Sequence, residues 1–352
     1  FCRALAGTHP HLVSAQPLFL TAGHAVEMQA VVRAIESVIA LPAYQAAVKN
    51  HAPEIAGFRP GPSGVFMGYD FHLGPDGPRL IEINTNAGGA LINAYVRQAQ
   101  LVCCGEMALA AVMTADPAAV LSSFVDSFHS EWRKQRKAGA MRSIAIVDQE
   151  PMQQYLYPEF VLFQRLFERH GISALIVDPT GLSHRENALW AGDRRIDLVY
   201  NRLTDFDLSQ STSSVLRRAY LAGDVVVTPN PWAHAHFADK RNLALLSDAA
   251  RLREWGVAPD AMAILIRGIP CTVPVTRGTA DALWTSRGNL FFKPCTGYGS
   301  KAAYRGDKIT RKVWRDILGG SYVAQQIVPP SLRTIAIDGR SENLKADLRC
   351  YT

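Results

Sequence analysis

The chain is organised around GYDFHLGPDGPRLIEINTNAGG, residues 68–89. We predict a β-hairpin with strands over 69–73 and 80–84, because the Pro-Asp-Gly-Pro turn between them adopts backbone angles that a strand cannot use. Successive side chains alternate between the two faces of a strand, so Asp70, Glu82 and Asn84 are expected on one face. The rest of the second strand is apolar, so we expect Glu82 to be largely buried.

This face is a candidate metal site. A buried carboxylate without a partner is unfavourable, and residues 80–84 contain no basic side chain. Three converging oxygens suit a hard divalent cation, and Mg²⁺ held by carboxylates and phosphates is the common case. The alternative interpretation is a hairpin whose carboxylates are solvated, and this stretch alone does not separate the two.

The pattern GxD…ExN, followed by Thr85 and a glycine-rich turn, resembles the metal-binding end of the ATP-grasp ligases. That superfamily includes D-alanine–D-alanine ligase and the glutathione synthetases. The resemblance implies that Asp70, Glu82 and Asn84 hold the Mg²⁺ ions that bridge the phosphates of ATP. In most of the superfamily this motif comes last, whereas here it lies in the first quarter of the chain.

The composition is that of a globular protein. Of 352 residues, 48% are hydrophobic and 19% are charged, and no apolar run reaches the length of a membrane span. The net charge of +6 is too small and too scattered to indicate nucleic acid, although it suits anionic small molecules. Six cysteines without CxxC spacing favour a reduced, cytoplasmic protein. The chain begins Phe1-Cys2-Arg3, without Met or a signal-peptide pattern, as a fragment would.

Helices are predicted on both sides of the hairpin. Residues 1–17 are expected to form a loop, and apolar residues recur at helical spacing over 21–41 until Pro42. Further helices are expected over 43–49, 90–114 and 118–137. Basic residues gather at the C-terminal end of the last helix, where the helix dipole favours cations, and we interpret them as a solvated helix end: Arg133, Lys134, Arg136 and Lys137.

From residue 141 strands and helices alternate. Strands are predicted over 143–147, 173–177, 196–200 and 224–227, with helices over 156–170 and 213–221. This alternation predicts a Rossmann-like parallel sheet with helices on both faces, and ligands bind beyond the carboxyl ends of such strands. Asn201 and Arg202 follow the third strand, where Arg202 would pair either with a substrate carboxylate or in a surface salt bridge. We assign Asn86 to the same substrate site.

A second candidate motif is GNLFFKPCTGYGSKAAYRGDK, residues 288–308. The expected strand over 289–293 ends at Lys293 and leads into a loop with Gly297, Gly299 and Ser300. Glycines let backbone N–H groups approach phosphate oxygens, and the lysine adds a point charge. The motif matches neither the P-loop pattern nor the dinucleotide-binding GxGxxG pattern. A purely structural hairpin turn is the alternative interpretation.

This block is similar to the ATP-grasp loop that covers the phosphates, which implies nucleotide-binding roles for Lys293 and the 297–300 loop and a catalytic role for Lys293. Asp239-Lys240 resembles the segment whose lysine reaches the phosphates, and a helix is predicted to begin at about 238 and to continue beyond 252. Two nearby imidazoles lack a third candidate ligand, so we do not expect a metal there: His234 and His236.

The segment YVAQQIVPP, residues 322–330, resembles the ATP-grasp strand and hinge that receive adenine. The resemblance implies that Gln325 is the polar hinge residue and that backbone groups of Ile327 and Val328 meet the adenine edge. The family often has a Glu shortly after the hinge for the ribose, but this chain has Pro, Ser and Arg there.

The last predicted strand is LKADLRCY, residues 344–351. Lys345, Asp347 and Arg349 are expected on one face, either in the active site or on the solvated side of an edge strand. In the first case Arg349 would be a catalytic residue that stabilises the negative charge of the transferring phosphoryl group or of a tetrahedral intermediate.

The order of the motifs is cyclically shifted. In an ordinary ATP-grasp chain the parts found here at 239–349 come first and those at 68–89 come last. Close surface termini permit such a rearrangement. The chain therefore resembles a circularly permuted ATP-grasp protein, of the kind seen in eukaryotic-type glutathione synthetase. We expect an α/β (α+β) chain with three regions: 1–138 with the metal-binding end, 139–235 as a Rossmann-like substrate domain, and 236–352 as the nucleotide-binding region.

The resemblance implies an ATP- and Mg²⁺-dependent ligase that joins a carboxylate to an amine through an acylphosphate. The substrates would be small molecules or short peptides, without nucleic acid or membrane as partners. Two alternatives remain: a small-molecule kinase on the same scaffold, and a nucleotide-binding protein without catalysis.

Overall fold

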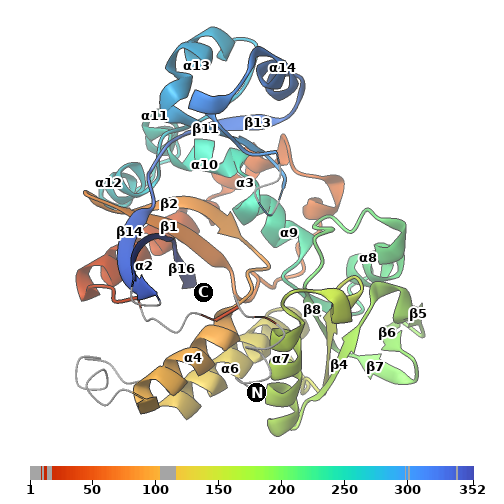
Figure 1. Ribbon diagram of the computed structural model, residues 1–352. Coiled ribbons are helices and arrows are strands. Elements are labelled where there is room, and N and C mark those ends of the chain that lie inside the picture. Colours follow the sequence, from red (N-terminus) through yellow and green to blue (C-terminus); the bar gives the residue numbers. More distant parts are fainter. Residues whose placement is uncertain are drawn as a thin grey trace.

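The computed structural model describes residues 9, 12–13, 18–103, 116–297, 299, 302–337 and 340–352. Figure 1 shows three groups of elements: a small sheet with α13 (Ala280–Ser286) and α14 (Arg311–Gly319) at one end, the hairpin of β1 (Gly68–Gly74) and β2 (Gly77–Asn84) in the middle, and a parallel sheet at the other end. The predicted loop over 1–17 and the predicted helix beyond Cys103 fall largely outside the described residues.

The predicted hairpin is confirmed as β1 (Gly68–Gly74) and β2 (Gly77–Asn84), in which Asp70 lies directly opposite Glu82. Gly77 closes the turn with φ +99°, a backbone angle that glycine adopts readily. The pairing register shifts after Asp70, so that Ile81 is an extra residue in β2. Such a β-bulge changes the direction in which local groups point.

The C-terminal strand of the described chain shares a sheet with the hairpin from its first quarter. The strand β16 (Leu348–Tyr351) pairs antiparallel with β1, and Arg349 lies opposite Asp70. The three-stranded order is therefore β16-β1-β2, with Asp70 on the central strand. A strand from the C-terminal end thus reaches the motif that the sequence places near the start.

A second antiparallel sheet has the order β10-β13-β11-β12. Its strands are β10 (Thr272–Pro274), β13 (Tyr322–Gln326), β11 (Leu290–Pro294) and β12 (Tyr304–Arg305). The helices α13 (Ala280–Ser286) and α14 (Arg311–Gly319) accompany it, and α14 places Trp314 and Ile317 against Phe292 of β11. Burying such a large aromatic side chain stabilises the strand that carries Lys293.

The predicted parallel sheet is confirmed, with the order β4-β3-β8-β9. Its strands are β4 (Ser173–Val177), β3 (Ser143–Val147), β8 (Leu198–Asn201) and β9 (Val226–Thr228). Alternate residues of β3 pack into two different cores: Ile144 and Ile146 join α7 (Tyr157–Arg169), α6 (Pro117–Arg136) and α4 (Ala90–Cys103), whereas Ala145 and Val147 join α8 (Ser214–Leu221). Helices therefore cover both faces.

The N-terminal helices pack far from their neighbours in sequence. The helices α2 (Ala22–Ile39) and α3 (Pro42–Lys49) share a core with β1, β2 and α12 (Pro259–Gly268). The predicted regions 1–138 and 236–352 thus have a common hydrophobic core. Among the described residues, no single helix is long and apolar enough to cross a membrane, although α2 and α3, bent by 76° at their junction, pass that test together.

Two predicted elements were wrong in their extent. The strand over 196–200 is interrupted at Asp197, and its first residue belongs to an unforeseen meander of β5 (Leu182–Arg185), β6 (Ala188–Ala191) and β7 (Arg194–Ile196). The helix from 238 is instead a short α9 (Pro231–Ala233), a π-helix over His234–Ala238, then α10 (Arg241–Leu246) and α11 (Ala249–Glu254). Asp248 separates the last two because its carboxylate caps the start of α11.

The final strand was also wrong, because it divides at Asp347. Residues up to Ala346 form β15 (Arg340–Ala346), which pairs with β14 (Ser331–Ile337) in a separate hairpin. Only residues after Asp347 join β1. Lys345 is therefore exposed on the hairpin, while Asp347 and Arg349 contact β1 through His72 and Asp70.

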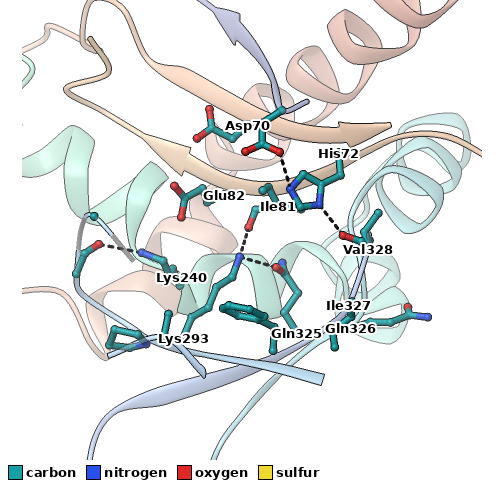
Figure 2. A pocket seen from close by; sticks show the side chains of 16 residues that line it. Asp70, His72, Ile81, Glu82, Lys240, Lys293, Gln325, Gln326, Ile327 and Val328 are labelled. Atoms are coloured by element: carbon teal, nitrogen blue, oxygen red, sulfur yellow. Dashed lines mark hydrogen bonds and ion pairs between the residues drawn. The ribbon is translucent and has the colours of Figure 1, made fainter. Parts of the chain in front are cut away.

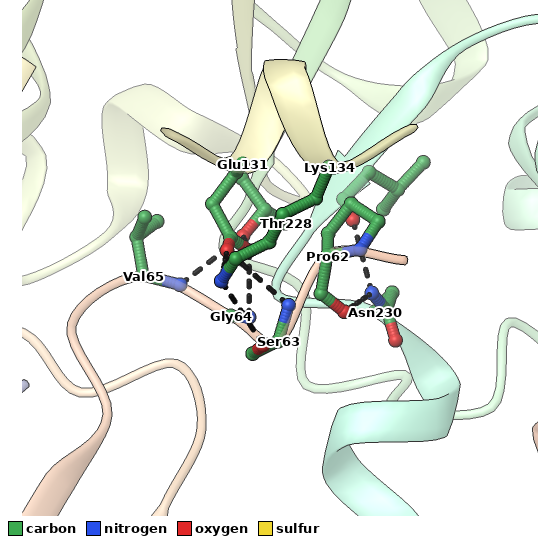
Figure 3. A network of polar contacts seen from close by, with 9 residues as sticks. Pro62, Ser63, Gly64, Val65, Glu131, Lys134, Thr228 and Asn230 are labelled. Carbon is green, nitrogen blue, oxygen red and sulfur yellow. Dashed lines mark hydrogen bonds and ion pairs between the residues drawn. The ribbon is translucent and has the colours of Figure 1, made fainter. Parts of the chain in front are cut away.

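A buried carboxylate holds the loop that leads into β1 (Figure 3). Glu131 of α6 is 2% exposed and accepts hydrogen bonds from the backbone N–H groups of Ser63 (3.2 Å) and Gly64 (2.6 Å), from Thr228 Oγ1 (2.8 Å) and from Lys134 Nζ (2.7 Å). The network joins α6, β9 and the 61–65 loop. Lys134, one of the basic residues predicted to lie at a solvated helix end, thus has a buried partner in Glu131.

Replacing Glu131 by Gln is expected to lower the free energy of unfolding by about 3 kcal/mol, because the amide nitrogen would face donors and the charge that these donors solvate would be lost. Lys134→Met should cost less than about 1 kcal/mol, since the Lys134 side chain is 42% exposed. Urea denaturation monitored by circular dichroism measures both. Equal losses in the two variants would contradict this account of the network.

Candidate active site

The site is a cavity of about 290 Å³ between the β16-β1-β2 sheet and the β10-β13-β11-β12 sheet, so residues far apart in the sequence face each other across it. Figure 2 shows Asp70 and Glu82 on one side and Lys240 and Lys293 on the other. The remaining lining comes mainly from β11, the glycine loop and the hinge: Phe291, Pro294, Gly297, Gly299, Gln325, Gln326, Ile327 and Val328.

The predicted metal-binding side chains do converge. Asn84 Nδ2 donates to Asp70 Oδ2 (3.0 Å) and to Glu82 Oε1 (3.0 Å), which places both carboxylates beside one amide. Two carboxylates and an amide oxygen are hard oxygen donors of the kind that bind Mg²⁺, so the residues fit that ion. Among the described residues, no group of three or more His, Cys, Asp or Glu side chains is placed to hold a metal, which includes the surroundings of His234 and His236.

The cationic partner of Asp70 comes from outside the hairpin. Arg349 bonds both oxygens of Asp70, with Nε 2.5 Å from Oδ1 and Nη2 2.7 Å from Oδ2. Burial raises the pKa of Asp70, and the Arg349 guanidinium opposes that rise. Glu82 is partly buried; burial acts to raise its pKa, but Lys240, the Asn84 amide and Lys293 together hold the pKa below its ordinary value. Both carboxylates therefore have protein cations nearby that come from distant parts of the sequence.

Lys293 links the two sheets. Its Nζ donates to the carbonyl oxygen of Ile81 (2.8 Å) and to Gln325 Oε1 (2.8 Å). Ile81 is the bulged residue of β2, so the bulge supplies the acceptor for this lysine. Burial lowers the pKa of Lys293 to about 8, against the attraction of Glu82. A lysine in this environment would gain from an anionic ligand.

Lys240 and the glycine loop lie next to each other. Lys240 Nζ donates to the carbonyl oxygen of Gly297 (3.0 Å), and both residues line the cavity. Gly299 also lines it and has φ +64°, a left-handed conformation that a glycine adopts at no steric cost. The predicted loop residue Ser300 lies outside the described residues.

The predicted hinge forms the other wall of the cavity, but several of its polar groups are already engaged. Gln325 is buried, with Oε1 bonded to Lys293 and Nε2 donating to Thr272 Oγ1 (3.3 Å). The Ile327 N–H donates to the carbonyl oxygen of Asn289 (2.9 Å). His72 Nδ1 donates to the carbonyl oxygen of Val328 (2.5 Å). The Gln325 side chain thus positions Lys293.

The predicted substrate residues lie together but outside this cavity. Asn86 Nδ2 donates to the carbonyl oxygen of Leu203 (3.1 Å), in the loop after β8. The Asn201 amide is used inside the protein, since it donates to the Pro229 carbonyl (3.2 Å) and accepts from the Leu203 N–H (3.1 Å). Arg202 is 6% exposed.

The Arg202 guanidinium is held by groups of β8 and of the turn that follows Asn84. Its Nη1 donates to the carbonyl oxygen of Ala87 (3.1 Å) and to the Tyr200 hydroxyl (3.3 Å), while its Nε has no hydrogen-bond partner. Arg202 therefore forms no surface salt bridge, and not all of its hydrogen-bond donors have partners. Arg202 lies under the glycine-rich turn that follows Asn84, and a Cβ on Gly88 would come within 3.0 Å of its Nη2.

One residue at the cavity edge, His72, was missed by sequence reasoning. His72 joins β1 to the hinge and also contacts Asp347 through Nε2 (3.1 Å), and both residues line the cavity. His72 lies two residues beyond Asp70, a spacing that suggests the same face of the strand. Asp347, predicted either in the active site or on a solvated face, lines the cavity, although the predicted strand is interrupted at this residue. A third contact, Thr85 Oγ1 to His234 Nδ1 (3.1 Å), attaches the residue after Asn84 to the π-helix.

No protein-family model matches the sequence, and no curated protein matches it significantly. Solved structures do match. The chain is similar to a glutathione synthetase-like effector from Globodera pallida in its apo form, with a TM-score of 0.62 and 13% identity over 92% of this chain and 75% of that one. It is also similar to a putative gamma-glutamylcysteine synthetase from Methylobacillus flagellatus KT, with a TM-score of 0.50 and 10% identity over 90% and 78% of the two chains.

At these identities the likeness concerns the fold. The predicted fold, a circularly permuted ATP-grasp arrangement with a parallel-sheet domain, is confirmed. The convergence of strands from both chain ends in the β16-β1-β2 sheet is the feature that carries this arrangement.

Proposed function

We propose that this chain, which has the fold of glutathione synthetase-like proteins, binds ATP with Mg²⁺ in the cavity between its antiparallel sheets and joins a carboxylate to an amine. The sequence likeness is too low to transfer an activity. The proposal therefore depends on the residues that line the cavity.

One observation carries it: two carboxylates and two lysines, brought from distant parts of the sequence, face the same cavity. Lys293 reaches across to the strand of Glu82 and bonds the Ile81 carbonyl at 2.8 Å. A triphosphate with a divalent cation has complementary charges on its two sides. Acidic and basic groups on facing walls suit this ligand better than a purely anionic or purely cationic one.

Each part of the site has a role in this proposal. Asp70, Glu82 and Asn84 would hold Mg²⁺, which would neutralise part of the phosphate charge and orient the phosphates. Lys293 and Lys240 would neutralise phosphate oxygens from the opposite wall. Backbone N–H groups of the glycine loop, including Gly297 and Gly299, would contact phosphate oxygens. The adenine edge would meet the Ile327 carbonyl and the Val328 N–H beside the groups that are already bonded.

The reaction then needs positioning rather than a protein nucleophile. A substrate carboxylate oxygen attacks the γ-phosphorus and ADP leaves, which produces an acylphosphate. An amine attacks the acyl carbon, loses a proton and expels phosphate to form an amide. Arg349 lies beside the carboxylates and would stabilise negative charge as it develops. Exclusion of water by the glycine loop would protect the acylphosphate.

The carboxylate substrate is proposed to bind beside the turn that follows Asn84. Arg202 is a buried cation whose Nε lacks a hydrogen-bond partner, and Asn86 is anchored to the same loop. A carboxylate of a small molecule or short peptide is the group that an under-satisfied guanidinium would bind. Asn201 would maintain the shape of this loop, since its amide donates to the Pro229 carbonyl and accepts from the Leu203 N–H.

A second candidate, nucleotide binding without catalysis, is favoured by one observation. Arg349 already bonds both Asp70 oxygens, so the proposed metal site is closed by an internal ion pair. If this pair persisted with nucleotide bound, turnover would be lost while binding remained.

A trapping assay separates these functions. The chain is incubated with Mg²⁺-ATP, hydroxylamine and a panel of amino acids, polyamines and short peptides. A ligase is expected to release ADP and form a hydroxamate in the presence of its acid. ADP with a phosphorylated acceptor and no hydroxamate would indicate a kinase. ATP binding by calorimetry without ADP release across the panel would indicate binding alone and overturn the ligase proposal.

A further inference from the structure

Asp70 is bonded more completely than a vacant metal ligand would be. It is 8% exposed, and each of its oxygens accepts a hydrogen bond from Arg349, at 2.5 Å and 2.7 Å. Asn84 adds a third donor at 3.0 Å. A bidentate guanidinium–carboxylate pair is among the strongest ion pairs in proteins. The proposed metal ligand is thus held by a cation of the protein itself.

The strand order places Arg349 beside Asp70. Asp70 lies on the central strand with Arg349 opposite it on β16 and Glu82 opposite it on β2. Gly68 leaves room for the arginine, because a Cβ there would lie 2.8 Å from Arg349 Cδ and 2.9 Å from its Nε. The arginine therefore lies flat across β1 to reach the carboxylate.

A divalent cation on Asp70 and Glu82 would share the Asp70 carboxylate with the guanidinium. Two cations on one carboxylate repel each other strongly in a partly buried site. Arg349 is able to withdraw because its side chain is 33% exposed and its remaining contacts are loose: Nη1 lies 3.4 Å from the Gly88 carbonyl oxygen, and the guanidinium lies 6.0 Å from the centre of the Tyr351 ring. A withdrawn guanidinium needs another anion, and the phosphates of ATP would supply one on this side of the cavity.

We propose that Arg349 competes with the metal ion for Asp70 and that nucleotide releases this competition by accepting the guanidinium. This inference rests on the proposed Mg²⁺-ATP site. Its consequence is an order of binding: the protein binds metal weakly alone and tightly once nucleotide is present. Arg349 would then act first as a guard of Asp70 and afterwards as a phosphate ligand. Idle binding of free metal would be suppressed.

The test measures metal affinity without turnover. Mn²⁺ binding to the whole chain is followed by the electron paramagnetic resonance signal of free Mn²⁺, with and without the non-hydrolysable analogue AMP-PNP, and the Mn²⁺ that AMP-PNP binds in a protein-free control is subtracted. Arg349→Met keeps much of the side-chain volume and removes the charge. We expect this variant to bind Mn²⁺ at least about tenfold more tightly than wild type when nucleotide is absent. With AMP-PNP the advantage should disappear or reverse, because the phosphate contact is lost.

Matched variants make the result specific. Arg340→Met removes an exposed arginine of β15 and should leave Mn²⁺ affinity unchanged. Glu82→Gln should lose Mn²⁺ binding in both conditions. Thermal melting shows whether Arg349→Met folds; if it does not, Arg349→Lys, which keeps the charge and loses the two-pronged contact, should still tighten Mn²⁺ binding about threefold without nucleotide.

The failures are distinguishable. Suppose that wild type binds Mn²⁺ in the presence of AMP-PNP. If, in the absence of nucleotide, the Arg349 variant binds Mn²⁺ no more tightly than wild type does, the competition is disproved and the proposed function stands. If wild type binds no Mn²⁺ even with AMP-PNP, the proposed Mg²⁺-ATP site itself fails and the inference fails with it.

Discussion

Glu82→Gln is expected to lower Mg²⁺-dependent ATP turnover by about a thousandfold while the fold remains intact. The substitution keeps the shape of the side chain but removes the charge that faces Lys240 and Lys293 across the cavity. Glu82 also has no direct ion pair with a protein cation among the described residues, so its charge is more available to a metal than that of Asp70. Loss of this one carboxylate should therefore affect metal binding more than stability.

The measurement is ADP release with the acid identified by trapping, together with a thermal melt. Glu342→Gln is the matched control, because Glu342 is exposed on β15. Its turnover should equal that of wild type. A Glu82→Gln protein that still produced ADP at the wild-type rate would disprove the metal assignment.

Lys293→Met is expected to weaken ATP binding by about a hundredfold, since a charged hydrogen bond to phosphate contributes about 1.5–3 kcal/mol and burial strengthens it further. Lys293 also bonds Ile81 and Gln325, so part of the effect would come from less rigid closure of the two sheets. Isothermal titration calorimetry with AMP-PNP measures the dissociation constant. Lys312→Met, on the exposed face of α14, is the control and should bind normally. An unchanged dissociation constant for Lys293→Met would remove this lysine from the site.

The pH dependence gives Lys293 a separate signature. Burial lowers its pKa to about 8 in the free protein, and ATP binds the protonated form. Below pH 8 the lysine is already charged and binding needs no proton from it. Above pH 8 the neutral lysine must take up a proton on binding, so the affinity of wild type should fall as pH rises, by up to about tenfold per pH unit. Lys293→Met should lack this fall between pH 7 and pH 9.5.

The site was predictable wherever its residues follow one another at a regular spacing. Asp70, Glu82 and Asn84 were assigned to one face because alternation along a strand is local, and the turn at 74–78 specified the hairpin. Lys293 was identified by its place before a glycine loop. The β-bulge at Ile81, in contrast, arises from the pairing of the two strands, and no residue in the hairpin predicts it.

The fold divides in the same way. Short buried runs such as 143–147 predicted the parallel sheet, because strands covered on both faces are continuously apolar. The meander over 182–196 escaped notice because its strands have only three or four residues, too few to establish a period. The division of the last strand at Asp347 followed from two different partners, β14 and β1, which compete for adjacent residues.

Local spacing in the amino-acid sequence was sufficient to determine the hairpin, the alternating sheet and the chemical types of side chain at the site. Tertiary structure alone decided that Arg349, 279 residues away, holds Asp70, and that Lys293, 212 residues away, bonds Ile81. The physical reason is that backbone periodicity acts over a few residues. Contacts across such separations depend on closing a long loop and on the pairing register of strands that meet only in the folded chain.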